Sequence, residues 1–106
     1  MFLFLANLKV AAENRKEFSQ TMDAIVNQIR SQTECVKATL CQDIEDETSF
    51  ILLTEWTARK DLENYIRSDR FGVLLGAGCL LEHPLSMEIL PYPNVAGTEA
   101  VLAMRR

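Results

Sequence analysis

Four side chains of this 106-residue sequence have the chemistry to bind or activate a small organic molecule. Asn7 interrupts an apolar run and brings an amide donor. Tyr65 brings a phenol, which donates a hydrogen bond readily but is a poor base at neutral pH. Glu55 is the candidate base, provided that it is buried. Trp56 is wide enough to form the wall of a cavity.

Each of these residues also has a purely structural interpretation. A buried amide without a partner costs about 1–3 kcal/mol, so Asn7 must bond to a ligand or to neighbouring backbone, unless it is exposed beyond the core. Glu55 can face solvent, and Trp56 can pack against the helix that follows it. The residue types alone leave both interpretations open.

Metal chemistry is not expected from the remaining reactive residues. The one histidine, His83, precedes a proline and is read as a residue at the edge of a loop. No pair of carboxylates or Cys/His cluster has the spacing of metal ligands. Cys35, Cys41 and Cys79 follow no metal-binding or redox spacing, so free thiols in a reducing cytoplasm are expected.

Charge and hydropathy exclude two classes of partner. The formal charge of -4 comes from 15 acidic and 11 basic residues, and the basic residues form no cluster that would bind nucleic acid. No apolar run approaches the roughly 20 residues of a membrane-spanning helix. The start, MFLFLANLKV, lacks the basic region of a signal peptide and is interrupted by polar residues, so we interpret it as a strand of a cytoplasmic protein.

Residue patterns predict the elements that position these side chains. Residues 2–10 have the period of a strand, with one face that is apolar throughout and another that is apolar only at first. The apolar face consists of Phe2, Phe4, Ala6, Leu8 and Val10. The helix that follows, from 14 to about 32, is predicted to start with a capping box between Asn14 and Glu17. Its apolar stripe consists of Phe18, Met22, Ile25, Val26 and Ile29.

The second half of the sequence repeats this order. Residues 35–44 and 49–56 predict a hairpin, and the alternation after His83 predicts a last strand within 83–93. Between them, Thr57 is a candidate cap for one helix and Ser68 for another. The faces of these two helices hold Leu62, Tyr65 and Ile66, and then Phe71, Leu74 and Leu75.

The order β-α-β-β-α-β predicts a ferredoxin-like α+β domain over residues 1–93, with an antiparallel sheet and its helices on one face. The other face would carry Leu3, Leu5, Ile51, Leu53 and Leu90. Because so large an apolar surface is unusual in water, we expect a symmetric homodimer. Residues 94–106 form a tail, in which Gly97 and Thr98 could introduce a short helix or which could lie along the partner subunit.

The segment TEWTARKDLENYIRSDRFGVLL resembles the antibiotic biosynthesis monooxygenase domain family, at Glu55, Trp56, Tyr65, Ser68 and Phe71. The resemblance extends from residue 2 to about 92 and implies a dimeric α+β barrel. It also implies a monooxygenase that needs no cofactor and that binds a small aromatic or quinol-type substrate between helices and sheet.

A haem-degrading branch of this family uses an Asn on the first strand, an aromatic residue on the second helix and a His ligand. Asn7 and Tyr65 match the first two, but Leu75 stands at the place of the His, so haem degradation is not expected. The resemblance implies Asn7 and Tyr65 as catalytic residues and Trp56, Phe71, Leu75 and Glu55 as substrate-binding residues. The alternative is a non-catalytic dimeric barrel that binds a small molecule or regulates a partner.

Overall fold

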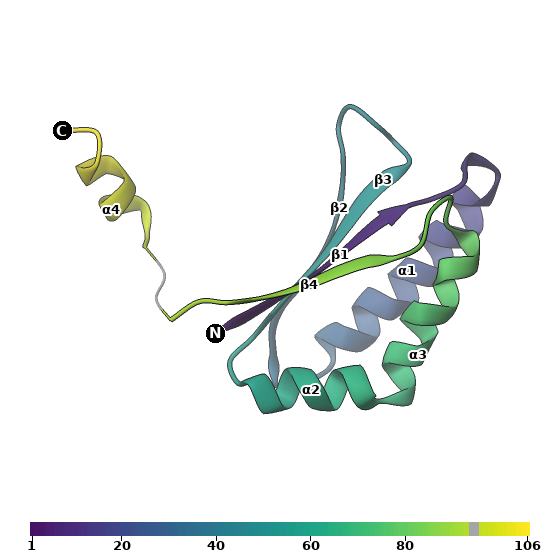
Figure 1. Cartoon of the computed structure of the whole chain (residues 1–106), viewed down its shortest axis with the longest axis horizontal. Helices are drawn as coiled ribbons and strands as arrows, with labels where there is room; N and C mark the ends of the chain where they lie inside the picture. Colours follow the sequence, from purple (N-terminus) through teal and green to yellow (C-terminus); the bar gives the residue numbers. More distant parts are fainter. Residues whose placement is uncertain (94–95) are drawn as a thin grey trace.

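The first strand of the sequence lies inside a four-stranded antiparallel sheet (Figure 1). The computed structural model describes residues 1–93 and 96–106, and its strands lie in the order β2-β3-β1-β4. Their bounds are Phe2–Lys9 for β1, Cys35–Gln42 for β2, Ser49–Trp56 for β3 and Ser86–Pro91 for β4. All four strands confirm the predicted ones, with ends that differ by three residues or fewer.

The pairing register decides which side chains share a face of the sheet. Phe4 of β1 lies between Thr54 of β3 and Ile89 of β4, and Asn7 lies opposite Ser86. Paired residues of antiparallel strands point to the same side, and the side alternates with every residue. The faces of β3 and β4 can therefore be read from β1.

One face of the sheet is covered and the other is open. Phe4, Ala6 and Leu8 are at most 2% exposed and face the helices, whereas Leu3 and Leu5 are only half-buried on the other side. We call that other side the open face. Its apolar residues are Leu3, Leu5, Ile51, Leu53 and Leu90, as predicted.

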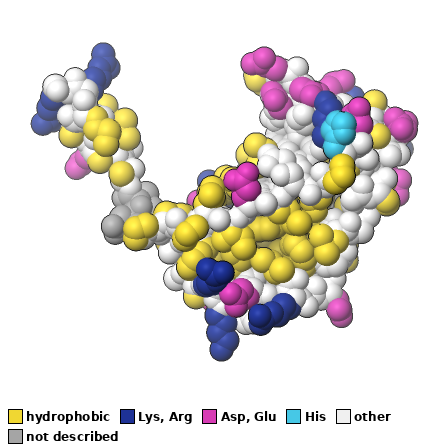
Figure 2. Space-filling model, viewed as in Figure 1, with side chains coloured by type: hydrophobic (Ala, Val, Ile, Leu, Met, Phe, Trp, Pro, Cys, Tyr) yellow, Lys and Arg dark blue, Asp and Glu magenta, His cyan; other side chains and the backbone are white. Residues whose placement is uncertain are grey.

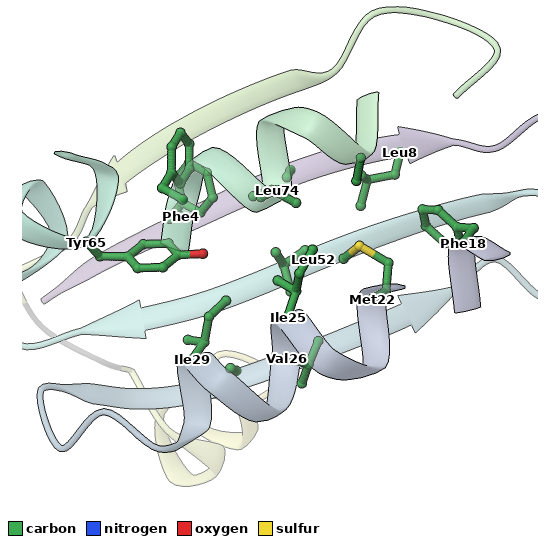
Figure 3. Packing of buried hydrophobic residues seen from close by; sticks show 14 of the residues in the cluster. Phe4, Leu8, Phe18, Met22, Ile25, Val26, Ile29, Leu52, Tyr65 and Leu74 are labelled. Atoms are coloured by element: carbon green, nitrogen blue, oxygen red, sulfur yellow. The ribbon is translucent and has the colours of Figure 1, made fainter. Parts of the chain in front are cut away.

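The first three α-helices form a single layer on the covered face, and the fourth lies apart from it (Figure 1). Their bounds are Arg15–Arg30 for α1, Arg59–Arg67 for α2, Asp69–Gly76 for α3 and Thr98–Ala103 for α4, with 3-10 turns at Ala12–Asn14 and Ala77–Leu80. Figure 3 shows the stripe of α1 directed toward the sheet. Its five predicted residues are all buried, which confirms the stripe.

The junction between α2 and α3 is set by Ser68. Its backbone is extended, and its Oγ accepts from the backbone N–H of Phe71 at 3.3 Å, which is the predicted N-cap. The same hydroxyl donates to the carbonyl of Tyr65 at 2.5 Å. Ser68 therefore ends one helix and starts the next.

Two predicted caps are wrong. Asn14 precedes α1, but its side chain makes no cap; instead Nδ2 donates to the carbonyl of Leu80 at 3.3 Å, so there is no capping box with Glu17. Asn14 has φ -102° and ψ 5°, outside the extended region of most N-caps. Thr57 caps no helix either, because the extended residue before α2 is Ala58, one position later.

The C-terminal helix stands apart from the rest of the chain. Gly97 and Thr98 introduce α4, as predicted, while residues 94 and 95 of the predicted tail lie outside the described residues. Figure 1 shows α4 on the opposite side of the sheet from α1, α2 and α3. No helix in the described part of the chain has both the length and the apolar character to cross a bilayer.

Candidate functional site

The sheet separates the predicted site residues into two groups. Trp56, Tyr65 and Phe71 are buried on the covered face, at 0%, 3% and 6% exposure. Asn7 follows the buried Ala6 in β1 and is exposed on the open face. Glu55 pairs with Leu3 and shares that face. The structure thus brings three predicted residues together and places Asn7 and Glu55 on the other side of the sheet.

The three residues on the covered face continue into an aromatic chain. Trp56 and Tyr65 stack with centroids 5.4 Å apart. Phe71 meets Tyr65 edge-on at 5.5 Å, and Phe4 meets Phe71 edge-on at 5.9 Å. Sequence reasoning missed Phe4 as a site residue, although its place on the same strand face as Phe2 was predicted. Trp56, Tyr65, Phe71 and Phe4 are called the aromatic chain below.

The polar atom of Trp56 is satisfied inside the core. Nε1 donates to Thr54 Oγ1 at 2.8 Å, and that hydroxyl is placed to donate to the carbonyl of Phe4 at 3.5 Å. Thr54 is 0% exposed and is the polar residue of an otherwise apolar core. A buried hydroxyl that both accepts and donates costs little. This network holds Trp56 in place beneath Tyr65.

The hydroxyl of Tyr65 has no such partner. Its oxygen is buried, and no atom among the described residues hydrogen-bonds to it. Figure 3 shows this oxygen directed into the apolar interior. Burial raises the pKa of Tyr65 from 10.0 to about 12, so the phenol stays neutral at physiological pH. Tyr65 can therefore donate a hydrogen bond, but it cannot act as a base.

An apolar groove lies beside the aromatic chain. It is lined by Phe4, Ile66, Phe71, Met87, Glu88 and Ile89 and has a volume of about 350 Å³. We call it the β4 groove, because α2 and α3 leave the covered side of β4 partly open. Met87 and Ile89 remain 40% and 42% exposed there. Figure 2 shows this hollow as a continuous hydrophobic surface. Leu75, a predicted binding residue, lies on α3 and is 50% exposed.

A second hollow lies at one end of the open face. It has a volume of about 450 Å³, and its lining includes Asn7, Lys9, Cys41, Ile51 and His83. We call it the open-face cleft. The Lys9 ammonium already donates to the carboxylate of Asp46. His83 was predicted to lie at the edge of a loop, and the pairing of Asn7 with Ser86 brings this segment before β4 next to Asn7.

A third and smaller hollow borders the helix junction. Its volume is about 210 Å³, and it is lined by polar residues that include Gln32, Asn64, Ser68 and Arg70, together with Tyr65. The side-chain nitrogen Nε2 of Gln32 is buried and has no hydrogen-bond partner in the described chain. Tyr65 therefore lies between a polar hollow and the apolar β4 groove.

No ion site is evident around these hollows. Within residues 1–93 and 96–106, no group of three or more His, Cys, Asp or Glu side chains could hold a metal ion. His83 lies at the open-face cleft, so no histidine borders the β4 groove. Apart from Glu88, the residues that line the groove are aromatic or aliphatic, and one of them, Phe71, contacts the ring of Tyr65.

Comparison with known sequences identifies a family. Residues 1–74 match the model of the family described as Antibiotic biosynthesis monooxygenase. A relative from Haloquadratum walsbyi, named "Putative heme-binding protein", is 31% identical over 77 residues. The match covers 71% of this chain but 14% of that relative, so the chain spans only a small part of the length of this curated protein.

Comparison with solved structures extends the similarity to nearly the whole fold. An antibiotic biosynthesis monooxygenase superposes with a TM-score of 0.80 at 16% identity, over 89% of this chain and all of its own. A conserved protein from Methanosarcina mazei gives 0.78 at 21% identity, over 84% of this chain and 89% of its own. Rv0793 from Mycobacterium tuberculosis gives 0.80 at 18% identity, over 91% and 98%. Identities this low show the fold alone, and they confirm the predicted ferredoxin-like architecture.

Proposed function

The chain belongs to the antibiotic biosynthesis monooxygenase family, and from this premise we propose that it binds a small aromatic or quinol-type molecule in the β4 groove and oxidises it with O2. The observation that carries the proposal is the buried hydroxyl of Tyr65, a member of the aromatic chain, which has no hydrogen-bond partner among the described residues. A buried polar group that lacks a partner is unfavourable for folding. Such a group is kept at lower cost when a ligand uses it.

The β4 groove suits a flat apolar ring. Its volume of about 350 Å³ falls within the roughly 300–1,000 Å³ of small-molecule sites. Phe4 and Phe71 offer aromatic surfaces, and Met87 and Ile89 form an aliphatic wall. Phe71 lines the groove and also touches Tyr65 edge-on. We infer that Phe71 shifts on binding, so that a ligand in the groove reaches the hydroxyl of Tyr65.

The proposed reaction draws its electrons from the substrate. In the keto form of the substrate, an activated ring CH2 group loses two hydrogens and becomes a carbonyl that contains one atom of O2, while the other oxygen atom leaves as water. The substrate supplies four electrons and O2 accepts four, so no further reductant and no cofactor takes part. The neutral phenol of Tyr65 would donate to the substrate oxygen on which negative charge develops.

The proposal gives no role to Asn7 or Glu55 at the groove, because both lie on the open face. The substrate proton therefore leaves to solvent rather than to Glu55. One charged residue, Glu88, lines the groove. Because Glu88 pairs with Leu5, its side chain is on the open face of the sheet. Substrates that ionise readily are the ones that this site could oxidise.

Because we assign no side chain at the groove as a base for the substrate proton, a second candidate is also favoured. It is a barrel that binds the same kind of ligand without activating O2. In that case Tyr65 would donate to a carbonyl or hydroxyl oxygen of the bound molecule, and the aromatic chain would supply the contact surface. The two candidates share one site and differ only in turnover. A single pair of measurements separates them.

The donor set at the groove does not fit haem, although one relative is named for haem binding. Leu75, at the place of the ligand His, has an aliphatic side chain without a donor atom. His83 borders the open-face cleft on the other side of the sheet. No step of the proposed reaction passes through haem.

We place the site in a homodimer that is formed through the open face. Leu3, Leu5 and Leu53 are half-buried there, and Ile51 and Leu90 are each 42% exposed. The three helices that pack on the sheet, α1, α2 and α3, cannot cover this side, because all three lie on the other. A second copy that presents the same face would cover it through a two-fold axis.

The test measures oxygen uptake and ligand binding in the same preparations. Wild-type protein, Tyr65→Phe and Asn7→Ala are supplied with a panel of hydroquinones and anthrone-type polyphenols, and binding is followed by calorimetry without O2. We expect uptake to fall at least about tenfold in Tyr65→Phe and to remain unchanged in Asn7→Ala. Binding without uptake in the wild type would support the second candidate. Loss of activity in Asn7→Ala alone would move the chemistry to the open-face cleft.

A further inference from the structure

The C-terminal helix α4 exposes a set of large apolar side chains. Val101 is 60% exposed, Leu102 56% and Met104 81%. The helix has only six residues, and isolated helices shorter than about 12 residues are marginal in water. Packing against another surface is therefore needed to hold α4 in this conformation. Figure 2 shows hydrophobic atoms on α4 that touch nothing in the body of the molecule.

The direction of the tail points away from the chain's own helices. Tyr92 N donates to the carbonyl of Met1 at 3.0 Å, which holds the residue after β4 beside Met1, just before the start of β1. Beyond residues 94 and 95, Figure 1 shows α4 on the side of the open face, opposite α1, α2 and α3. A body packed on the open face would therefore lie next to α4.

The radius of gyration and the accessible surface of the chain both exceed those of a compact monomer of the same size. Its radius of gyration is 15.4 Å, whereas a compact chain of this length has about 13 Å. Its accessible surface is 7103 Å², against roughly 6,000 Å² for a compact monomer of this mass. The excess is comparable to the roughly 800 Å² that each partner buries in a standard interface.

Charge also favours association between the tail and the body of another copy. Residues 1–93 contain 14 acidic and 9 basic residues, whereas 94–106 contain one acidic residue, Glu99, and two basic residues, Arg105 and Arg106. The tail is thus basic and the body acidic. Opposite charges of this kind steer two surfaces together and fix their register.

We propose that α4 is an exchanged arm: in the homodimer it packs Val101, Leu102 and Met104 onto the second copy that covers the open face. This inference rests on the proposed dimer and goes beyond it, because it assigns the tail a partner. The α4 arm of each copy packs on the other copy, so two arm contacts add to the contact between the two open faces. The two arginines at the end of the arm meet the acidic body of that copy.

The first test compares dimer dissociation in full-length variants by sedimentation at several concentrations. Leu102→Asp should raise the dimer dissociation constant by about tenfold or more. Glu99→Gln, a change on the same helix outside the apolar set, should leave it within about threefold. A wild-type dimer that Leu102→Asp does not weaken would overturn the arm and leave the dimer intact. A monomeric wild type at micromolar concentration would overturn both, whereas oxygen uptake tests the groove independently.

The second test identifies what α4 touches. Leu102→p-benzoylphenylalanine is mixed with an affinity-tagged wild-type chain and irradiated. We expect a cross-link to the tagged copy. A cross-link confined to its own chain would show that the arm folds back and would overturn the exchange, as would the absence of any protein cross-link from a dimeric sample.

Discussion

Trp56 and Tyr65 stack at 5.4 Å with their ring planes 23° apart, but only one of the two has a partner for its polar atom. Nε1 of Trp56 donates to Thr54, whereas the hydroxyl of Tyr65 is buried without a hydrogen bond in the described chain. Of this stacked pair, Tyr65 therefore carries the unfavourable buried polar atom. The first two predictions concern that atom.

Tyr65→Phe should raise the free energy of unfolding by about 1 kcal/mol, because it removes a buried hydroxyl that has no partner and leaves the ring in place. Urea denaturation at pH 7 measures the change. Tyr92→Phe, which removes a hydroxyl from the half-buried residue that follows β4, should change the stability by less than about 0.5 kcal/mol. A clear loss of stability in Tyr65→Phe would mean that the hydroxyl does have a partner, such as a buried water.

The stability of the wild type should fall relative to Tyr65→Phe as the pH rises from 10 to 12. The folded-state pKa of Tyr65 is about 12 and the unfolded value is about 10, so only the unfolded chain loses this proton within that window. The free energy of unfolding of the wild type relative to Tyr65→Phe is therefore constant below pH 10 and falls as the pH rises through 12, by about 2 to 3 kcal/mol in total. Denaturation of both proteins at each pH gives the difference. A constant difference from pH 9 to 12 would contradict the burial of the phenol.

Ser68→Ala should destabilise the protein by about 1 kcal/mol, because the Ser68 hydroxyl caps α3 at the N–H of Phe71. Thr57→Ala is the matched control, since Thr57 was a predicted cap but caps no helix in the structure. Its effect should stay below about 0.5 kcal/mol. Thermal denaturation of both variants is sufficient. Equal losses would place the start of α2 at the position predicted from sequence.

Ile89→Trp should weaken binding of a hydroquinone probe by about tenfold or more, because the larger side chain fills the β4 groove. Leu90→Trp is the control: Leu90 is the next residue of β4 and equally exposed, at 42%, but it faces the other way. Calorimetry without O2 should find its affinity within about threefold of the wild type. If Leu90→Trp proved the more harmful change, the ligand would lie on the open face.

Sequence patterns were sufficient for most of the fold. The alternation in β1 and the stripe of α1 depend on periods of 2 and 3.6 residues, which are local properties of the chain. Ser68 was recognisable as a cap because a small polar residue stood between two apolar faces. The caps predicted at Asn14 and Thr57 were wrong because a shift of one residue, or a side chain captured by the carbonyl of Leu80, changes a cap without changing the pattern.

The candidate site depended on the tertiary structure, for a physical reason that begins in β1. The sequence by itself determined that Phe4 and Asn7 point to opposite sides of the sheet, because strand side chains alternate. Both sides were apolar, so it did not determine which one the helices cover. Packing of α1, α2 and α3 over Phe4 made that choice, and it put Asn7 on the open face. Only long-range contacts then joined Asn7 to His83 and enclosed the hydroxyl of Tyr65.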